Sequence, residues 1–535
     1  MVMNSSPAKG VLVLPSPLAQ SNIQSLLDEY GLEYTPDGQF IRWSASNKEH
    51  PRNWPLPRKI FDSSLIIFLD LFTTAISTAG SSAANSSHDE FGIGQTLAIF
   101  LFVSMSVYYL LYLPVVGSLN SVSRSYLIGQ MVGGIIFPPY SEAFGRKKLY
   151  IASTAFYAIF CVVIGVAPSL AVVTIGRFFS GFLSAIPSII VAGSIEDMFN
   201  SRDRVWLIFM WAMVANMGLA LGPIMSTYIT AHLGWNWVFY VAAIVNAVVT
   251  VLLFGLRESR PSLLLRRQVA RLRKESGIDT LRELNPDHAP DIKTFARLAL
   301  FRPLQLLFTE PIVFMVSLMS AVAFALIYLF TEALPLVYQS MGFSSTSSVL
   351  PFLGICVGLV LGLLTRIQDY RVIVNYEQQG IPLEPEHKLV GFSIGAPMLA
   401  AGLWWFAWTI PPLVTHVHWI VSTVSLVLIG YALNEFDAVL AGYLADSYLS
   451  YASSGFAALA LLRASLSAAF PLFATQMFNG LGANVASSIL AALATLFCVV
   501  PPFFTKYGRQ IRARSKFAKY SLKVYQENTV EKNGY

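Results

Sequence analysis

The sequence predicts an all-α protein that crosses a lipid bilayer many times. Of its 535 residues, 55% are hydrophobic and only 12% are charged, whereas a soluble protein carries about 25% charged residues. Apolar runs recur along the chain, most of them about 20 residues long, which is the length that a helix needs to cross roughly 30 Å of hydrocarbon. Because a helix satisfies its own backbone hydrogen bonds in lipid, we expect these runs to be helices.

The apolar runs fall into two groups on either side of a basic segment. Those of the first group are 61–81, 97–117, 126–139, 149–167, 170–193, 206–229 and 236–256, and those of the second are 311–330, 346–366, 389–409, 417–441, 454–476 and 484–506. The segment between them holds eleven Lys and Arg against six acids, and the chain from Lys506 onward holds eight against two. The positive-inside rule therefore places both basic regions in the cytosol.

This charge pattern predicts twelve crossings, six on each side of the basic segment. Residues 1–60 and 507–535 are expected to be cytosolic tails, and 257–309 is expected to be the cytosolic linker. Residues 61–256 and 310–506 are expected to form the two six-helix bundles.

One stretch is too long for the predicted topology. Runs 97–117 and 126–139 look like two helices, but only one crossing can separate Asp89, expected outside, from the basic Arg146, expected inside. Without residues 106–125, the flanking pieces join into 26 residues, or about 39 Å of helix, which suits one tilted crossing. We therefore interpret 106–125 as an insertion, such as a translated intron. The alternative is a re-entrant or interfacial segment.

The loop after the second expected helix carries a charged motif, "SEAFGRKK" (141–148). Glu142 supplies a carboxylate, Gly145 permits a tight turn, and Arg146 and Lys147 form a basic pair. A carboxylate and a guanidinium at this spacing can hold neighbouring helix ends together in one conformer. The motif resembles the first signature of the major facilitator superfamily, a conformational switch. An ordinary positive-inside loop explains the basic residues but not the whole spacing.

Two further motifs resemble signatures of that family. "RFFSG" begins at Arg177, inside the fourth expected helix, and resembles the signature whose arginine lies on the proton pathway. The other interpretation of Arg177 is a structural ion pair. "GLALGP", with Gly218, Gly222 and Pro223, resembles the antiporter signature of the fifth helix. Its two glycines share one helix face, so it could also be a packing surface alone.

Several stretches resemble the fungal drug:proton antiporters with twelve helices, within the polyamine and multidrug efflux group. They are "GWNWVFYV" (234–241), "YLADSY" (443–448) and "YGRQIRARS" (507–515). The resemblance implies two pseudo-symmetric six-helix bundles that rock against each other around a central site. It also implies a monomer that works without a cofactor and is driven by the proton gradient.

Ionisable residues inside the expected spans are candidates for the proton and substrate pathway. Besides Arg177, they are Asp70, Glu435, Asp437 and Arg463. A carboxyl group buried in an apolar region can exchange protons near neutral pH, as a proton-coupled carrier requires. Glu435 and Asp437 are two residues apart, so they point to different sides of one helix. Arg463 could instead be the structural partner of a carboxylate.

These features predict proton-coupled efflux of a drug, toxin or secondary metabolite across the plasma membrane. The alternatives are a proton-coupled uptake symporter and a membrane sensor that transports nothing. An enzyme is not expected, since the chain shows no clustered active site, and no metal site is expected. The net charge of +6 comes from Lys and Arg in the segments expected to be cytosolic, as the positive-inside rule requires. It therefore gives no reason to expect a nucleic acid partner. Asn85 begins a glycosylation sequon in a loop expected outside.

Overall fold

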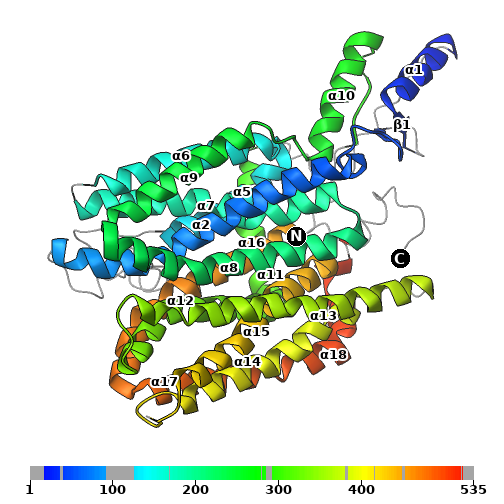
Figure 1. The fold of residues 1–535 in the computed structure, drawn as a ribbon. Helices are drawn as coiled ribbons and strands as arrows, with labels where there is room; N and C mark the ends of the chain where they lie inside the picture. Colours follow the sequence, from blue (N-terminus) through cyan, green and yellow to red (C-terminus); the bar gives the residue numbers. More distant parts are fainter. Residues whose placement is uncertain are drawn as a thin grey trace.

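The computed structural model describes residues 17–35, 40–91, 126–167, 169–278, 280–284, 292–379, 384–414, 416–448, 452–519 and 521. Their helices form two bundles that lie side by side, one above the other in Figure 1. The first bundle consists of α2 (Leu56–Phe91), α5 (Tyr126–Phe144), α6 (Lys147–Gly165), α7 (Leu170–Met198), α8 (Ser201–Leu233) and α9 (Asn236–Leu253). The second consists of α12 (Pro311–Ser340), α13 (Phe352–Gln378), α14 (Val390–Thr409), α15 (Trp419–Tyr448), α16 (Ala452–Leu481) and α17 (Ala483–Phe497), which α18 (Val500–Arg514) extends.

The number of membrane-crossing helices agrees with the twelve expected. Within the described part of the chain, eleven helices are long and apolar enough to span a bilayer. The remaining member of the first bundle is α5, which packs against α7 and α16. The expected all-α membrane fold is therefore confirmed. The segment interpreted as an insertion, 106–125, lies outside the described residues, and α5 begins directly after it.

The first helix is longer than the sequence predicted. We expected a helix over 61–81 and a loop from 82, but α2 runs to Phe91. No Gly or Pro interrupts the chain between Ser81 and Phe91, so nothing in that stretch stops the helix. Asn85 therefore lies in a helix and not in the loop that we expected for a glycosylation sequon. Its glycosylation stays a prediction.

The N-terminal segment is more than the simple tail that we expected over 1–60. Helix α1 (Pro17–Tyr30) is followed by an antiparallel pair of short strands, β1 (Leu32–Tyr34) and β2 (Ile41–Trp43). They pack on α10 (Pro261–Ser276), which belongs to the linker. The apolar side chains between these elements are Leu27, Leu32, Ile41, Trp43, Leu265, Val269, Leu272 and Leu281. We call this unit the tail–linker subdomain.

The tail–linker subdomain marks one end of the two bundles, which we call the basic end. In Figure 1 it extends from the right-hand end of the first bundle, with α1 and β1 beyond α10. The second linker helix, α11 (Ile292–Thr309), packs against α12 and α16.

The two bundles contact each other towards the basic end. The ring of Trp206 in α8 lies 5.9 Å from that of Tyr370 in α13, centre to centre. A Cβ atom added to Gly134 in α5 would lie 3.4 Å from Cβ of Ala460 in α16. These contacts join α8 to α13 and α5 to α16.

Candidate functional site

The loop between α5 and α6 has the tight geometry that its motif predicted. Gly145 has a φ of +95°, and an added Cβ would lie 2.7 Å from Oε2 of Glu258, so only glycine fits without strain. The carboxylate of Glu258 accepts hydrogen bonds from the backbone N–H groups of Arg146 (3.0 Å) and Lys147 (3.1 Å). These groups lie at the start of α6, where a negative charge is favoured by the helix dipole. Glu258 therefore ties the segment after α9 to α6.

The guanidinium of Arg146 is almost completely buried and is held by α7. Its Nη2 lies 2.9 Å from Oδ2 of Asp197, and its Nη1 donates to the carbonyl of Ile190 at 3.0 Å. Arg260 contacts the other oxygen of Asp197 at 3.4 Å. The motif loop is thus fastened to α7 and to the linker by charged hydrogen bonds, which are stronger than neutral ones.

Asp197 and Glu258 bind this loop, and the role that we predicted for Glu142 stays a prediction. Glu142 lies in the last turn of α5, and its side chain is outside what the structure describes. The sequence-based reasoning missed Asp197 and Glu258. The sequence offered one indication of their role. Each is an acid just after the end of an expected helix, with Arg residues nearby in the chain.

A second buried charge cluster lies in the other bundle and contains Glu435. Its carboxylate is completely buried and lies 3.0 Å from Nη2 of Arg366 in α13. The same nitrogen lies 2.9 Å from Asp369, one helical turn along. The guanidinium of Arg366 stacks at 5.2 Å on the ring of Phe209 in α8, so this cluster also touches the first bundle. A buried carboxylate without such a partner would be strongly destabilising.

Asp437 faces a different side of α15, as its spacing from Glu435 predicted. It forms an ion pair with Arg463 of α16. Its other oxygen accepts a hydrogen bond from Nδ2 of Asn216 in α8, at 3.3 Å. Arg463 also donates to Oγ of Ser320 in α12 at 2.8 Å. One carboxylate therefore joins two helices of the second bundle to a helix of the first.

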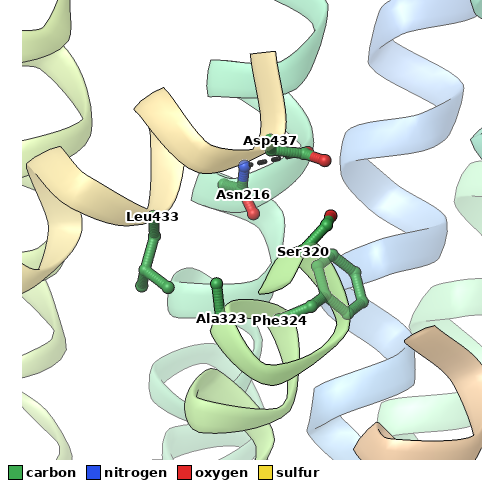
Figure 2. A pocket seen from close by; sticks show the side chains of 6 residues that line it. All are labelled: Asn216, Ser320, Ala323, Phe324, Leu433 and Asp437. Carbon is green, nitrogen blue, oxygen red and sulfur yellow. Dashed lines mark hydrogen bonds between the residues drawn. The ribbon is translucent and has the colours of Figure 1, made fainter. Parts of the chain in front are cut away.

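A narrow pocket lies beside this carboxylate, between the two bundles (Figure 2), and in this conformation its side chains leave no room for a water molecule. Its lining residues are Asn216, Ser320, Ala323, Phe324, Leu433 and Asp437. The guanidinium of Arg463 lies over the ring of Phe324, 4.6 Å from its centre. The pocket thus combines a carboxylate, an amide, a hydroxyl and an aromatic ring. These are groups that orient a small organic molecule by charge, hydrogen bonds and stacking.

Asp70 is buried in α2 and accepts a hydrogen bond of 2.6 Å from the indole nitrogen of Trp211. Its second oxygen has no hydrogen-bond partner among the described residues. Trp211 lies in α8, five residues before Asn216, which lines the pocket. Asp70 therefore belongs to the same central region as the pocket. Trp211 was not among our candidates, since a tryptophan in an apolar run gives no separate signal.

Arg177 is completely buried and forms hydrogen bonds to the backbone of α2. It donates to the backbone carbonyls of Ile76 and Ser77, each at 3.4 Å, and its guanidinium lies 4.6 Å from the ring centre of Tyr126. The hydroxyl of Ser77 in turn lies 2.7 Å from that of Tyr328 in the second bundle. The arginine is thus next to a contact between the bundles.

Gly218 and Gly222 bring α8 into close contact with α2. A Cβ atom added to either glycine would lie 2.3 Å from a backbone carbonyl oxygen of α2. At this short distance Thr74 and Thr78 of α2 donate hydrogen bonds to backbone carbonyls of α8, at 3.1 and 3.0 Å. The helix continues past Pro223 to Leu233. The antiporter-type motif therefore forms the contact between the helices that carry Asp70 and Asn216.

Two motifs of the fungal subgroup, 443–448 in α15 and 507–515 at the end of α18, meet at the basic end. Arg512 makes two hydrogen bonds to Glu386, at 2.9 and 2.5 Å. The hydroxyl of Tyr443 donates to the same carboxylate at 3.2 Å. An added Cβ on Gly508 would lie 2.7 Å from it. Glu386, which joins these motifs, was not among our candidates. Within the described residues, no cluster of His, Cys, Asp and Glu could hold a metal ion.

Two six-helix bundles around a buried, charged central pocket are the architecture of a membrane transporter. The family model described as Major Facilitator Superfamily matches residues 64–434. The chain is 33% identical over 476 residues to the multidrug transporter TPO1_2 of Candida glabrata, covering 88% of this chain and 78% of that protein. It is 34% identical over 407 residues to the efflux pump FUBT of Fusarium oxysporum, covering 75% and 68%.

Solved structures agree with this assignment at the level of the fold. The proton:xylose symporter XylE, from E. coli, matches with a TM-score of 0.57 at 16% identity, over 85% of this chain and 96% of that chain. The chain therefore belongs to the major facilitator superfamily. It is a multi-pass membrane protein of a transporter family.

Proposed function

We propose that the protein exports small organic molecules across the plasma membrane in exchange for protons. It would act as a monomer with both termini in the cytosol. The observation that carries this proposal is the Asp437–Arg463 ion pair, whose carboxylate lines a pocket between the bundles and is bonded to the first bundle through Asn216. A group that changes charge in this position can couple proton binding to the relative position of the bundles.

The contacts of Asp437 suggest how the coupling would work. In the ionised state its two oxygens bind Arg463 and Asn216, and this joins α15 to α8. Protonation would remove the charge that holds Arg463, which would keep its contacts with Ser320 and Phe324. The bond across the bundles would weaken and the bundles could separate. A substrate that occupies the pocket would compete with the proton for the same carboxylate.

The direction of transport is supported by two observations. Gly218 and Gly222, which resemble the antiporter signature, pack the helix that carries Asn216 against the helix that carries Asp70. The relatives above are named a multidrug transporter and an efflux pump. Both favour export over uptake. The lining of the pocket, with one aromatic ring, two aliphatic side chains and three polar groups, suits substrates of mixed character such as drugs, toxins or secondary metabolites.

The test is transport in vesicles that contain the purified protein, with an imposed pH gradient. A panel of fluorescent organic dyes serves as substrate, and a pH-sensitive dye reports proton flux. We expect dye to move against the proton flow and to stop when the gradient is collapsed. Asp437→Asn should abolish the response to the gradient while exchange of dye at equal pH persists.

The matched control is Asp446→Asn. Asp446 also lies in α15 and also pairs with a cation, Lys388, at 2.6 Å, but it does not line the pocket. This variant should keep the gradient response. Dye movement that ignores the gradient in the wild type would refute proton coupling. Dye that moves in the same direction as protons would identify an uptake symporter, and binding without flux would identify a sensor.

A further inference from the structure

Helix α10 of the linker has two chemically different faces. Its apolar face, with Leu265, Val269 and Leu272, is buried against α1, β1 and β2. Its basic residues Arg266, Arg267, Arg271 and Lys274 are exposed. Positions 267, 271 and 274 follow each other at spacings of four and three, so they lie on one side of the helix. We call these three residues the basic face of α10.

The basic residues of α10 outnumber the described acids near them. Within the described part of the subdomain, Glu283 lies near the helix, but it pairs with Arg273 at 2.7 Å and lies 3.9 Å from Arg266. Glu275 accepts a hydrogen bond from Tyr30 of α1. Glu283 is thus engaged with Arg273, whereas Glu275 keeps its charge four residues after Arg271 and leaves the helix with an excess of positive charge. Three cations side by side on one helix face repel each other and favour a negatively charged surface.

The position of α10 brings this face close to the membrane. The helix starts eight residues after α9 ends, and an added Cβ on Gly145, at the start of α6, would lie 2.5 Å from Leu263 of α10. In Figure 1, α10 stands at the end of the first bundle and extends past its edge, with α1 and β1 on the side away from the bundle. Because the subdomain covers the apolar face, the helix cannot insert that face into lipid.

We propose that the basic face of α10 binds the phosphate-bearing headgroups of anionic lipids in the membrane leaflet at the basic end. Juxtamembrane clusters of Lys and Arg bind such lipids by charge, and the attraction acts within a Debye length of the surface. The lipid headgroups would contact the basic face of α10, while α1, β1 and β2 cover its apolar face on the side away from the membrane. This role is separate from the transport cycle proposed above and does not depend on proton coupling.

The test uses the full-length protein in neutral nanodiscs that contain a trace of photoactivatable phosphatidylserine or phosphatidylcholine. Cross-linked peptides are mapped by mass spectrometry. We expect phosphatidylserine to label 261–276 in preference to phosphatidylcholine, and the preference to fall with added salt. Each cation near the surface contributes about five-fold to binding, so Arg267→Gln/Arg271→Gln/Lys274→Gln should weaken competition by unlabelled phosphatidylserine on the order of 100-fold. These side chains are exposed, so folding should be unaffected.

The matched control removes three exposed cations elsewhere at the same end, with Arg514→Gln/Lys516→Gln/Lys519→Gln. It should leave the labelling of α10 unchanged. An equal loss in the control would show a general charge effect and overturn the proposal. So would equal labelling by the two lipids, labelling that is insensitive to salt in the wild type, or cross-linking of α10 to a second copy or to another protein in place of lipid.

Discussion

The contact between α2 and α8 makes a quantitative prediction for Gly222→Ala. A Cβ at this position would lie 2.2 Å from Oγ1 of Thr78 and 2.3 Å from the carbonyl oxygen of Ala75. The second distance is about 1.1 Å shorter than the 3.4 Å at which ordinary contact begins. The obstacle is backbone, so no change of rotamer relieves it and the helices must separate. Overpacking of this kind costs about 1–3 kcal/mol.

The separation would have a second effect, because it lengthens the hydrogen bond of Thr78 to Leu219 across the two helices, now 3.0 Å. Bonds of this kind in membranes contribute about 0.6 kcal/mol. Thermal unfolding of the purified protein in detergent measures the combined cost of the overpacking and of the weakened hydrogen bond. We expect a lower melting temperature and a slower transport rate, because Asp70 and Asn216 lie on the two helices that move apart.

The matched control for this prediction is Gly442→Ala in α15. No atom lies within 4 Å of the added Cβ, and the position is helical. Alanine is favoured over glycine in a helix by about 1 kcal/mol, so this variant should be neutral or more stable. If Gly222→Ala melted at the same temperature as Gly442→Ala, the close contact of α2 and α8 would be refuted.

Two further predictions concern the basic end. Glu258→Gln removes the charge at the start of α6 and should destabilise the protein by about 1.5–3 kcal/mol in thermal unfolding, whereas Glu196→Gln, on an exposed ion pair, should cost under about 1 kcal/mol. Burial and nearby cations lower the pKa of His50 to about 4, below its unfolded value near 6.5. The unfolded segment therefore binds the proton first, and the tail–linker subdomain should loosen as the pH falls from 6.5 to 4. Limited proteolysis of the N-terminal segment measures this loosening. His50→Asn, which keeps an acceptor for the N–H of Arg52, should abolish the pH dependence; sensitivity that persists in this variant would contradict the assignment.

The sequence by itself determined that the fold is all-α and that its helices span a membrane. Apolar runs of membrane-spanning length and the distribution of Lys and Arg were enough to predict two bundles joined by a basic linker. The bilayer leaves few alternatives, since it accepts only segments that satisfy their own backbone. The spacing of Glu435 and Asp437 also sufficed to place them on different sides of one helix.

The local motifs predicted positions but not partners. Gly145 and Arg146 were found from their pattern, while the acids that bind them, Asp197 and Glu258, come from other helices. The N-terminal segment was expected to be a tail because it is polar and contains proline. Its few apolar residues form a core only when α10, more than 200 residues further along, covers them.

Only the tertiary structure decided how the buried charges are paired. Asp437 binds Arg463 and Asn216, and Glu435 binds Arg366, although nothing in the spacing of these residues distinguishes one pairing from another. The physical reason is that a buried charge must find its partner across the helix interface that it faces. The facing helix is fixed by packing, here by the glycines of α8 against α2, and packing depends on the whole assembled bundle.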